Sequence, residues 1–404
     1  MTAAADLRAV DRADVYVGDR LTAALTRDGK GVTTLDYRDP IPTGRTGGIA
    51  WSLPGPDSPF EVGGDALPAF FAGLLPEGVR LGVALTATKT SADDHFTLLL
   101  SVGSDTVGDV RVVPEGSEPR IRPPMVTDTV TDLREVFREF TSSFESDAVA
   151  LAGVQPKVSA SMWSTPTVTD RGPAILKLTP PSGFPKLVEN EHFFMRMAAA
   201  CGITAASTTI VEDESGVTGL LVERFDRRDG VRIPQEDACQ VLDVYPGAKY
   251  RMKTEEVISG LARTCERGGG SARAATVELL RIVVFSWLIG NGDLHGKNLS
   301  IHAPEGWWRP TPAYDLLTTQ PYLKWRDPMA MNLYGRANRL KRSDFIDAGE
   351  RLGVGARPMR RMIDELCDVS TTWIPRCAEI GFADRDTERL IALLTARAES
   401  LTGS

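Results

Sequence analysis

The segment LIGNGDLHGKN, residues 288–298, places a group of polar side chains directly after an apolar run. Asp293 and Asn298 stand five positions apart, and Asp315 follows Asn298 by seventeen residues in the sequence PAYDLL. Phosphoryl transfer needs such a set. One carboxylate orients the attacking hydroxyl and accepts its proton, while an amide oxygen and a second carboxylate hold Mg²⁺ against nucleotide phosphates. Taken singly, each Asp fits a loop cap or turn, but the whole set predicts kinase chemistry.

A kinase also needs a lysine on a strand to hold the phosphates and a helix glutamate to orient that lysine. The sequence ILKL offers Lys177 between apolar neighbours, and VENEHFF offers Glu191 near the start of a helix, with Glu189 as a rival. Both segments precede Asp293, as kinase order requires. Alone, Lys177 is more simply a solvent-facing strand lysine, and Glu191 a first-turn acid favoured by the helix dipole.

Two further segments stand where a kinase has its nucleotide contacts. No GxGxxG precedes Lys177, and AGVQPKVSAS, residues 152–161, takes its place. Its backbone amides and Lys157 are suited to cradle phosphates. The sequence VERFDRR, residues 222–228, stands where a kinase hinge presents backbone groups to adenine. The simpler interpretation of this segment is a surface salt-bridge region with Phe225 in the core.

The elements that must position these residues follow from periodicity and turn signals. Strands are predicted at residues 157–162, 174–178, 208–212 and 219–224. A helix is predicted over residues 188–201, and from about residue 237 helices dominate. Residues 279–289 are strongly apolar and predict a buried helix. Ser343 is predicted to cap the helix that follows it.

The chain upstream predicts a separate, smaller unit. Residues 14–53 alternate as short strands around tight turns, and residues 67–75 form an apolar helix candidate. Four prolines within residues 114–124 indicate a linker, and residues 130–144 have a helical pattern. The resulting plan is an α+β chain with a mostly β N-terminal domain (10–115), a linker (116–127), a mixed α/β kinase N-lobe (128–240) and a helical C-lobe (241–404).

Composition excludes several other classes of protein. The 404 residues are 42% hydrophobic and 25% charged, which is typical of a soluble globular chain. A net charge of −8 argues against coating of nucleic acid by bulk charge. Five scattered cysteines without a CxxC pair, and four histidines, predict neither a disulfide framework nor a zinc site. No stretch approaches the roughly 18 apolar residues of a membrane span, and no secretory signal is visible, so a cytoplasmic protein is expected.

Together these segments resemble the HipA family of bacterial Ser/Thr kinase toxins. The motifs that carry the resemblance stand in the family's order: GVQPK, ILKL, ENE, LVERFDRR, QEDACQ, GDLHGKN and AYDLL. FFAGLLPEGVR (residues 70–80) and DHFTLLLSVGSDTVGDVRVVP (residues 94–114) resemble the family's N-terminal domain. The resemblance covers residues 14–400 and implies a two-lobed protein-kinase-like fold that uses ATP and Mg²⁺ to phosphorylate a protein hydroxyl.

The resemblance also implies roles for single residues. Asp293 is then the catalytic base, Asn298 and Asp315 are the metal ligands, and Lys177 contacts the ATP phosphates. The remaining nucleotide-binding positions are Gly153, Val154, Gln155 and Lys157 in the phosphate loop, Glu223 and Phe225 at the adenine hinge, and His295 beside Asn298.

Family members usually pair with a small helix-turn-helix antitoxin that binds operator DNA, and some act on aminoacyl-tRNA synthetases. The resemblance therefore implies a type II toxin that reaches DNA only through its antitoxin, with no membrane partner. One position departs from the family. Many members autophosphorylate a serine three residues before the loop glycine and so switch themselves off, whereas this chain has Ala150. Either that control has moved to a neighbouring serine (Ser146, Ser159 or Ser161), or it is absent.

Two alternatives remain open from the sequence. A small-molecule phosphotransferase is one, because GDLHGKN also resembles the H-G-D-x-x-x-x-N loop of aminoglycoside kinases, with Asn291-Gly292 in place of His-Gly. Those enzymes lack the FFxGLLPE segment. A non-catalytic nucleotide-binding partner of a repressor is the other, although every expected catalytic position holds a competent residue.

Overall fold

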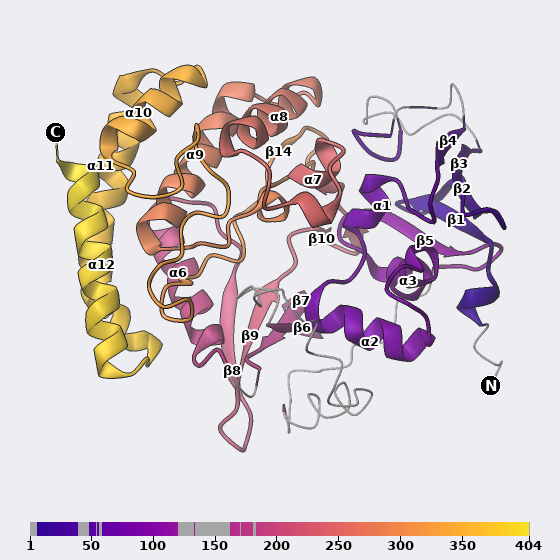
Figure 1. The fold of residues 1–404 in the computed structure, drawn as a ribbon, viewed down its shortest axis with the longest axis horizontal. Helices are drawn as coiled ribbons and strands as arrows, with labels where there is room; N and C mark the ends of the chain where they lie inside the picture. Colours follow the sequence, from indigo (N-terminus) through magenta and orange to yellow (C-terminus); the bar gives the residue numbers. More distant parts are fainter. Residues whose placement is uncertain are drawn as a thin grey trace.

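The computed structural model describes residues 6–38, 48–53, 55, 59–119, 133, 162–169, 171–180 and 183–403. Figure 1 shows the chain running from an N-terminal domain, drawn in indigo and purple, through a central sheet to a helical region that ends in yellow. The two termini lie at opposite ends of this view.

The N-terminal domain is built on a five-stranded antiparallel sheet in the order β4-β3-β2-β1-β5. Its strands are β1 (Arg12–Val17), β2 (Arg20–Arg27), β3 (Thr33–Tyr37), β4 (Phe60–Val62) and β5 (Val110–Pro114). Two helices, α1 (Ala69–Gly73) and α3 (His95–Val102), bury Phe70, Phe71 and Phe96 against Leu25 and Leu35 of the sheet. The apolar run expected to form a helix over residues 67–75 thus forms a shorter one.

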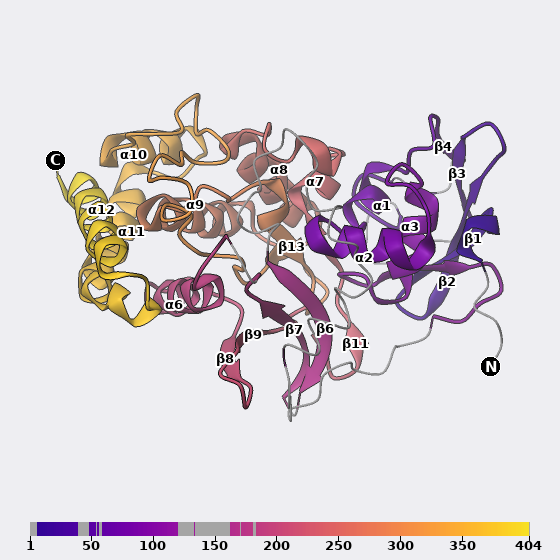
Figure 2. The same ribbon diagram turned by 60° about the horizontal axis from the view of Figure 1, so that its bottom comes forward.

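A third helix, α2 (Gly78–Thr88), joins this domain to the next sheet. Val79 packs against Trp163, Leu176 and Leu178, which belong to that sheet. Figure 2 shows α2 on the side of the N-terminal domain that faces the sheet. The two parts of the chain therefore share a buried contact.

The second sheet is antiparallel, with the order β6-β7-β9-β8. Its strands are β6 (Trp163–Thr169), β7 (Gly172–Leu178), β8 (Thr208–Glu212) and β9 (Thr218–Glu223), and α6 (Leu187–Ala200) packs against β8 and β9. Three of the predicted strands and the predicted helix agree with these bounds. The strand predicted over residues 157–162 lies outside the described residues except for Met162, which is not in a strand, and β6 begins one residue later.

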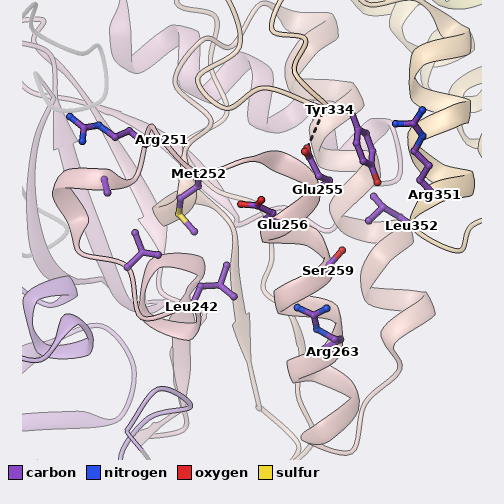
Figure 3. A pocket seen from close by; sticks show the side chains of 12 residues that line it. Leu242, Arg251, Met252, Glu255, Glu256, Ser259, Arg263, Tyr334, Arg351 and Leu352 are labelled. Carbon is purple, nitrogen blue, oxygen red and sulfur yellow. Dashed lines mark hydrogen bonds between the residues drawn. The ribbon is translucent and has the colours of Figure 1, made fainter.

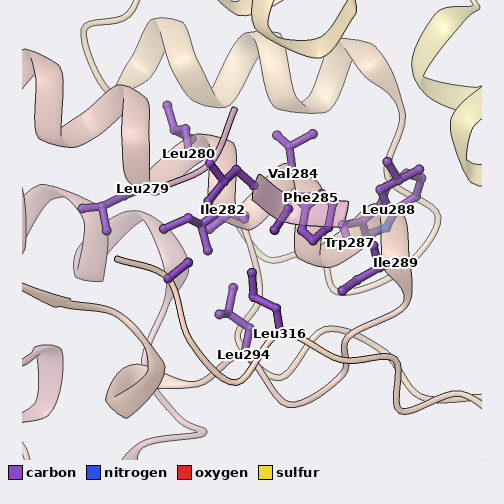
Figure 4. Close-up of a cluster of buried hydrophobic side chains, with 14 of the residues drawn as sticks. Leu279, Leu280, Ile282, Val284, Phe285, Trp287, Leu288, Ile289, Leu294 and Leu316 are labelled. Atoms are coloured by element: carbon purple, nitrogen blue, oxygen red, sulfur yellow. The ribbon is translucent and has the colours of Figure 1, made fainter. Parts of the chain in front are cut away.

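Helices form the rest of the chain, as expected. They are α7 (Ala238–Val241), α8 (Thr254–Arg267), α9 (Ala272–Ile289), α10 (Arg342–Arg351), α11 (Ala356–Trp373) and α12 (Asp384–Thr402). A small sheet of β12 (Gln235–Asp237), β13 (Ser300–His302) and β14 (Arg309–Pro310) accompanies them. A two-stranded ribbon of β10 (Arg227–Arg228) and β11 (Val231–Arg232) lies before β12. Helix α9 is central, and its side chains form the core shown in Figure 4.

The expected cap at Ser343 is wrong. Helix α10 begins one residue earlier, and Lys341 precedes it. The Lys341 backbone N–H donates to the carboxylate of Asp344 at 2.8 Å. Asp344, the third residue of the helix, thus bonds back to the residue that precedes it, and Ser343 lies inside the first turn.

Several other predictions fall outside the described residues. These are the phosphate loop, residues 120–127 of the linker, and the helix of residues 130–144 except Leu133, which is helical and buried. No described helix is long and apolar enough to cross a membrane. All five cysteines are buried and unpaired.

Candidate active site

The loop that carries Asp293 begins where the buried helix α9 ends. Gly290 adopts a left-handed conformation (φ +75°) that terminates the helix. Figure 4 shows Leu294 and Leu316 beside the apolar side chains of α9. Both leucines are fully or almost fully buried. Because each follows an acidic residue directly, their burial fixes the places of Asp293 and Asp315.

Asp293 is held by hydrogen bonds from within the loop and from outside it. Its backbone N–H donates to the side-chain oxygen of Asn291 at 2.9 Å. The hydroxyl of Tyr250 donates to Asp293 Oδ1 at 2.8 Å. Burial and the charge of Asp293 raise the pKa of Tyr250 above its ordinary value, so this hydroxyl keeps its proton.

Lys177 on β7 is the centre of a buried polar group that we call the catalytic cluster, namely Lys177, Glu191, Asn298 and Asp315. Lys177 Nζ donates to Glu191 Oε1 at 2.7 Å and also forms an ion pair with Asp315. Asn298 Nδ2 donates to the other oxygen of Asp315 at 3.2 Å. The rival Glu189 instead pairs with Lys186 at 2.9 Å. The structure thus brings together the strand lysine, the helix glutamate and two of the loop residues that the sequence analysis selected.

Charges inside the catalytic cluster are not fully compensated. Burial raises the pKa of Glu191 above its ordinary value, against the opposing effect of Lys177. Burial would lower the pKa of Lys177, but Asp315 and Glu191 raise it, so the lysine stays charged. Among the described residues, the buried Glu191 Oε2 has no hydrogen-bond partner. Such an unpaired acceptor is costly and is typical of a site that binds something further.

Asp315 has the backbone conformation of a strained residue. Its φ is +55°, in the left-handed region that residues with a Cβ seldom adopt. Such strain gathers at functional sites. The Asp315 carboxylate and the Asn298 amide are hard oxygen donors of the kind that Mg²⁺ takes, and Mg²⁺ usually completes its shell with phosphate oxygens and water. The residues therefore fit a magnesium–nucleotide site. No larger group of His, Cys, Asp and Glu among the described residues is suited to hold a metal.

His295 is buried in the same loop. Burial and the nearby Lys249 lower its pKa to about 4, so its imidazole is neutral near pH 7. Its ring meets Tyr250 edge-on, with centroids 4.9 Å apart. The backbone N–H of His295 donates to Asn298 Oδ1 at 3.1 Å. His295 thereby orients the Asn298 side chain.

Of the two predicted hinge residues, Glu223 is the last residue of β9 and Phe225 follows the strand by two positions. The backbone N–H of Glu223 donates to the Ser207 carbonyl at 3.0 Å. The Phe225 ring lies 5.8 Å from the ring of Tyr314, the residue before Asp315. Phe225 is therefore next to the segment that carries Asp315. The four phosphate-loop positions (Gly153, Val154, Gln155 and Lys157) and Ala150 lie outside the described residues.

The simpler interpretation of a surface salt-bridge region holds only for Arg228, which is exposed and pairs with Asp229. Arg224 and Arg227 are largely buried. They form a second, largely buried ion cluster, the junction cluster, made of Asp105, Arg224, Asp226, Arg227 and Arg232. Asp105 belongs to the N-terminal domain, and its carboxylate accepts from all three arginines. This cluster joins the N-terminal domain to the end of β9.

Sequence reasoning missed some residues that contact the catalytic loop. Tyr250 donates to Asp293, and Glu77 in FFAGLLPEGVR accepts from Lys297 Nζ at 2.9 Å and also pairs with Lys249. Lys297 was visible in GDLHGKN but had no assigned role. A sequence signal existed only for Glu77, because its motif belongs to the resemblance.

A pocket of about 590 Å³ lies apart from these residues. Figure 3 shows it between the start of α8 and the end of α10, with Met252, Arg263, Tyr334 and Arg351 in its wall. None of its lining residues is one that the sequence analysis selected for chemistry.

A four-stranded antiparallel sheet with one helix glutamate, a strand lysine paired to it, and a loop of Asp293 and Asn298 after a buried helix define a protein-kinase-like fold. Comparison with family models agrees. Residues 149–374 match the HipA-like C-terminal domain, and residues 13–113 match the HipA N-terminal domain. The chain belongs to the HipA family.

Individual relatives support the same assignment. Y4mE of Sinorhizobium fredii, whose name assigns it to the kinases, is 32% identical over 91% of both chains. The serine/threonine-protein kinase toxin HipA of Shewanella oneidensis is 29% identical over 65% of both. A chain of the Shewanella oneidensis HipA, HipB and operator DNA complex has the same fold, with a TM-score of 0.75 at 22% identity over 96% of both chains.

Proposed function

We propose that this chain is an ATP-dependent protein kinase that transfers the γ-phosphate to a serine or threonine hydroxyl of a protein. The observation that carries the proposal is the catalytic cluster, in which Lys177 lies between Glu191 and Asp315, and Asp315 is bonded to Asn298. A solvated strand lysine needs neither a buried glutamate nor a strained aspartate beside it.

Each residue has a role in this proposal. Asp293 orients the substrate hydroxyl and accepts its proton, while Tyr250 holds its carboxylate and Asn291 holds its backbone N–H. Lys177, oriented by Glu191, binds phosphate oxygens, and Asn298 and Asp315 hold Mg²⁺. When bound, ATP would supply the phosphoryl group, and Mg²⁺ would offset the negative charge of the phosphates. The other proposed nucleotide contacts are Gly153, Val154, Gln155 and Lys157 at the phosphates and Glu223 and Phe225 at adenine. His295 lies behind Asn298.

We further propose that the kinase is the toxin of a toxin–antitoxin pair. A structure with the same fold is a complex with HipB and operator DNA, which supports a small helix-turn-helix antitoxin as partner and DNA contact only through it. A relative is itself named a kinase toxin. The substrate we propose is a translation component such as an aminoacyl-tRNA synthetase, and the site of action is then the cytoplasm. The family match over residues 13–113 favours this function over an aminoglycoside-like phosphotransferase.

The test compares the purified wild type with Asp293→Asn. If Asp293 is the base, phosphoryl transfer falls by about 10² to 10⁴, the usual contribution of a positioned general base. ATP binding, measured by calorimetry, survives because its contacts lie elsewhere. Production of the wild type alone should arrest growth, and production of the variant should not. Near-normal transfer by Asp293→Asn would refute Asp293 as the base. Arrest by both proteins would contradict the proposal and favour a non-catalytic partner of a repressor.

A further inference from the structure

The carboxylate of Glu77 reaches out of the N-terminal domain and binds two lysines of the kinase lobes. Its Oε1 accepts from Lys297 Nζ at 2.9 Å, and its Oε2 pairs with Lys249. Lys297 also donates to the carbonyl of Gly73, at the end of α1, at 2.9 Å. Glu77 itself stands directly before α2. The N-terminal domain thus binds the Lys297 ammonium group through one carboxylate and one backbone carbonyl group.

Each of these lysines is the neighbour of a residue of the active site. Lys297 directly precedes Asn298. Lys249 directly precedes Tyr250, whose hydroxyl donates to Asp293 at 2.8 Å. The backbone carbonyl of Lys249 also accepts from the N–H of Gly296 at 3.2 Å. A shift of either lysine is therefore passed to the proposed catalytic base or to a proposed metal ligand.

The loop also packs directly against the segment that carries Lys249. A methyl group on Gly296 would lie 2.4 Å from Met252 Sδ and 3.0 Å from Cys239 Sγ. Real Cβ atoms essentially never show the first distance, and the second is tighter than most of their contacts. The loop and the 249–252 segment are consequently in direct contact, which the hydrogen bond from Gly296 to Lys249 also shows.

Charge makes Glu77 necessary for this arrangement. The Lys249 and Lys297 side chains are only 12% and 18% exposed, so water screens them little. Burial would raise the pKa of Glu77, but the two lysines hold it at about 2, and the carboxylate is ionised at neutral pH. Without that charge, two poorly solvated cations would face the same neutral group and repel each other.

We propose that Glu77 is a positioning residue of the catalytic loop, so that the N-terminal domain is part of the active site. The inference rests on the proposed kinase function. The alternative is that Glu77 only fastens the two domains together. Asp105 distinguishes these two cases. Like Glu77, it bridges the domains through ion pairs, but its arginine partners lie at β9–β11 and not in the catalytic loop.

The kinetic test uses the full chain with Glu77→Gln, and with Asp105→Asn as the matched control. Glu77→Gln should lower kcat by about 10- to 100-fold, as expected when a reacting group is misplaced by a fraction of an ångström. The KM for ATP should stay within about twofold of the wild type. Asp105→Asn should keep kcat at saturating ATP. Equal losses of kcat in both variants, or no loss in Glu77→Gln, would overturn the proposal.

A second variant approaches the contact from the other partner. Lys297→Gln should also lower kcat, and Glu77→Gln combined with Lys297→Gln should cost less than the product of the two single losses, because the repulsion is gone. Independent, multiplicative losses would show that the two side chains do not act through each other, which contradicts the proposal.

Hydrogen exchange of residues 288–299 provides a measurement that does not depend on kinase activity. Glu77→Gln should speed exchange in that segment, and Asp105→Asn should not. Unchanged exchange overturns the proposal whatever the kinetics, and faster exchange with an unchanged kcat overturns the positioning role. A wild type that transfers no phosphate would instead refute the proposed function, and exchange alone would then decide whether Glu77 holds the loop.

Discussion

The catalytic cluster and the junction cluster are both buried sets of opposite charges, yet they differ in how well their polar atoms are satisfied. In the junction cluster, Asp226 accepts three bonds from Arg224 and Arg227 and one from the backbone N–H of Gly108. In the catalytic cluster, Glu191 Oε2 has no partner among the described residues. A satisfied network indicates structure, and an unsatisfied one indicates a binding site.

The pKa shifts of one carboxylate in each cluster, Asp226 and Glu191, run in opposite directions. Burial would raise the pKa of Asp226, but the hydrogen bonds and charge of Arg224 keep it below its ordinary value. Burial raises the pKa of Glu191 despite Lys177. The junction cluster therefore compensates its carboxylates fully, whereas the catalytic cluster keeps one acid poised for a change in its surroundings.

The largest effect should come from breaking the satisfied cluster. Asp226→Asn removes a charge between Arg224 and Arg227, and we expect a loss of about 3 to 5 kcal/mol in the free energy of unfolding, as for other broken buried pairs. Denaturant unfolding measures it. A loss below about 1 kcal/mol, the range of exposed pairs, would show that the junction cluster is not the structural one.

Breaking the other cluster should affect catalysis more than stability. Lys177→Met removes the charge that we propose binds the phosphates, and phosphoryl transfer should fall by about 10² to 10³, as when one preorganised donor is removed. Calorimetry should show weaker binding of Mg-ATP. If Lys177→Met instead lowers the stability of the chain strongly while the folded fraction keeps its activity, the two clusters do not differ as described.

The residues of the catalytic cluster could be predicted from the order of motifs along the sequence. Kinase chemistry imposes an order on Lys177, Glu191, Asn298 and Asp315, and each stands beside a strong local pattern. Tyr250 and Glu77 could not be assigned roles in this way, because no kinase motif prescribes them and their contacts with the loop arise only from the fold. The same limit applies to Asp105, whose arginine partners were interpreted as surface residues.

Local structure was predictable where apolar periodicity is strong, as in α9 and α6, and less so at its edges. The strand β6 contains Pro166 within a threonine-rich run, which conceals its pattern. Ser343 has the right chemistry for a cap, but Asp344 can reach the Lys341 N–H and takes that place. Which of two neighbouring polar side chains bonds at a helix start depends on backbone geometry, and the sequence does not specify that geometry.

One buried histidine lies beside each cluster and provides a pH test. Burial lowers the pKa of His295, and that of His302 beside Phe225, from 6.5 to about 4. Protonation of these histidines therefore favours the unfolded chain, so their contribution to stability is complete above pH 6.5 and is lost as the pH drops from 6.5 to 4. Each histidine should contribute about 1.4 kcal/mol per pH unit in that window. His302→Gln should reduce the slope by about 1.4 kcal/mol per pH unit, and an unchanged slope would contradict the burial of His302.

The smallest effect should come from Tyr250→Phe. This variant removes only the hydroxyl that donates to Asp293, and a hydrogen bond to a charged group contributes about 1.5 to 3 kcal/mol. We expect kcat to fall by roughly tenfold, with the KM for ATP unchanged. Stopped-flow or steady-state transfer assays would detect the change. A rise in the KM for ATP without a change in kcat would place Tyr250 at the nucleotide and not at the base.

The most direct test of the kinase assignment is the transfer of labelled γ-phosphate from Mg-ATP to the proteins of a bacterial lysate, followed by mass spectrometry of the modified peptides. We predict phosphoserine or phosphothreonine on a small number of proteins with the wild type, and none of these with Asp293→Asn or Lys177→Met. Transfer to small molecules alone, or the same phosphopeptides with all three proteins, would contradict the account.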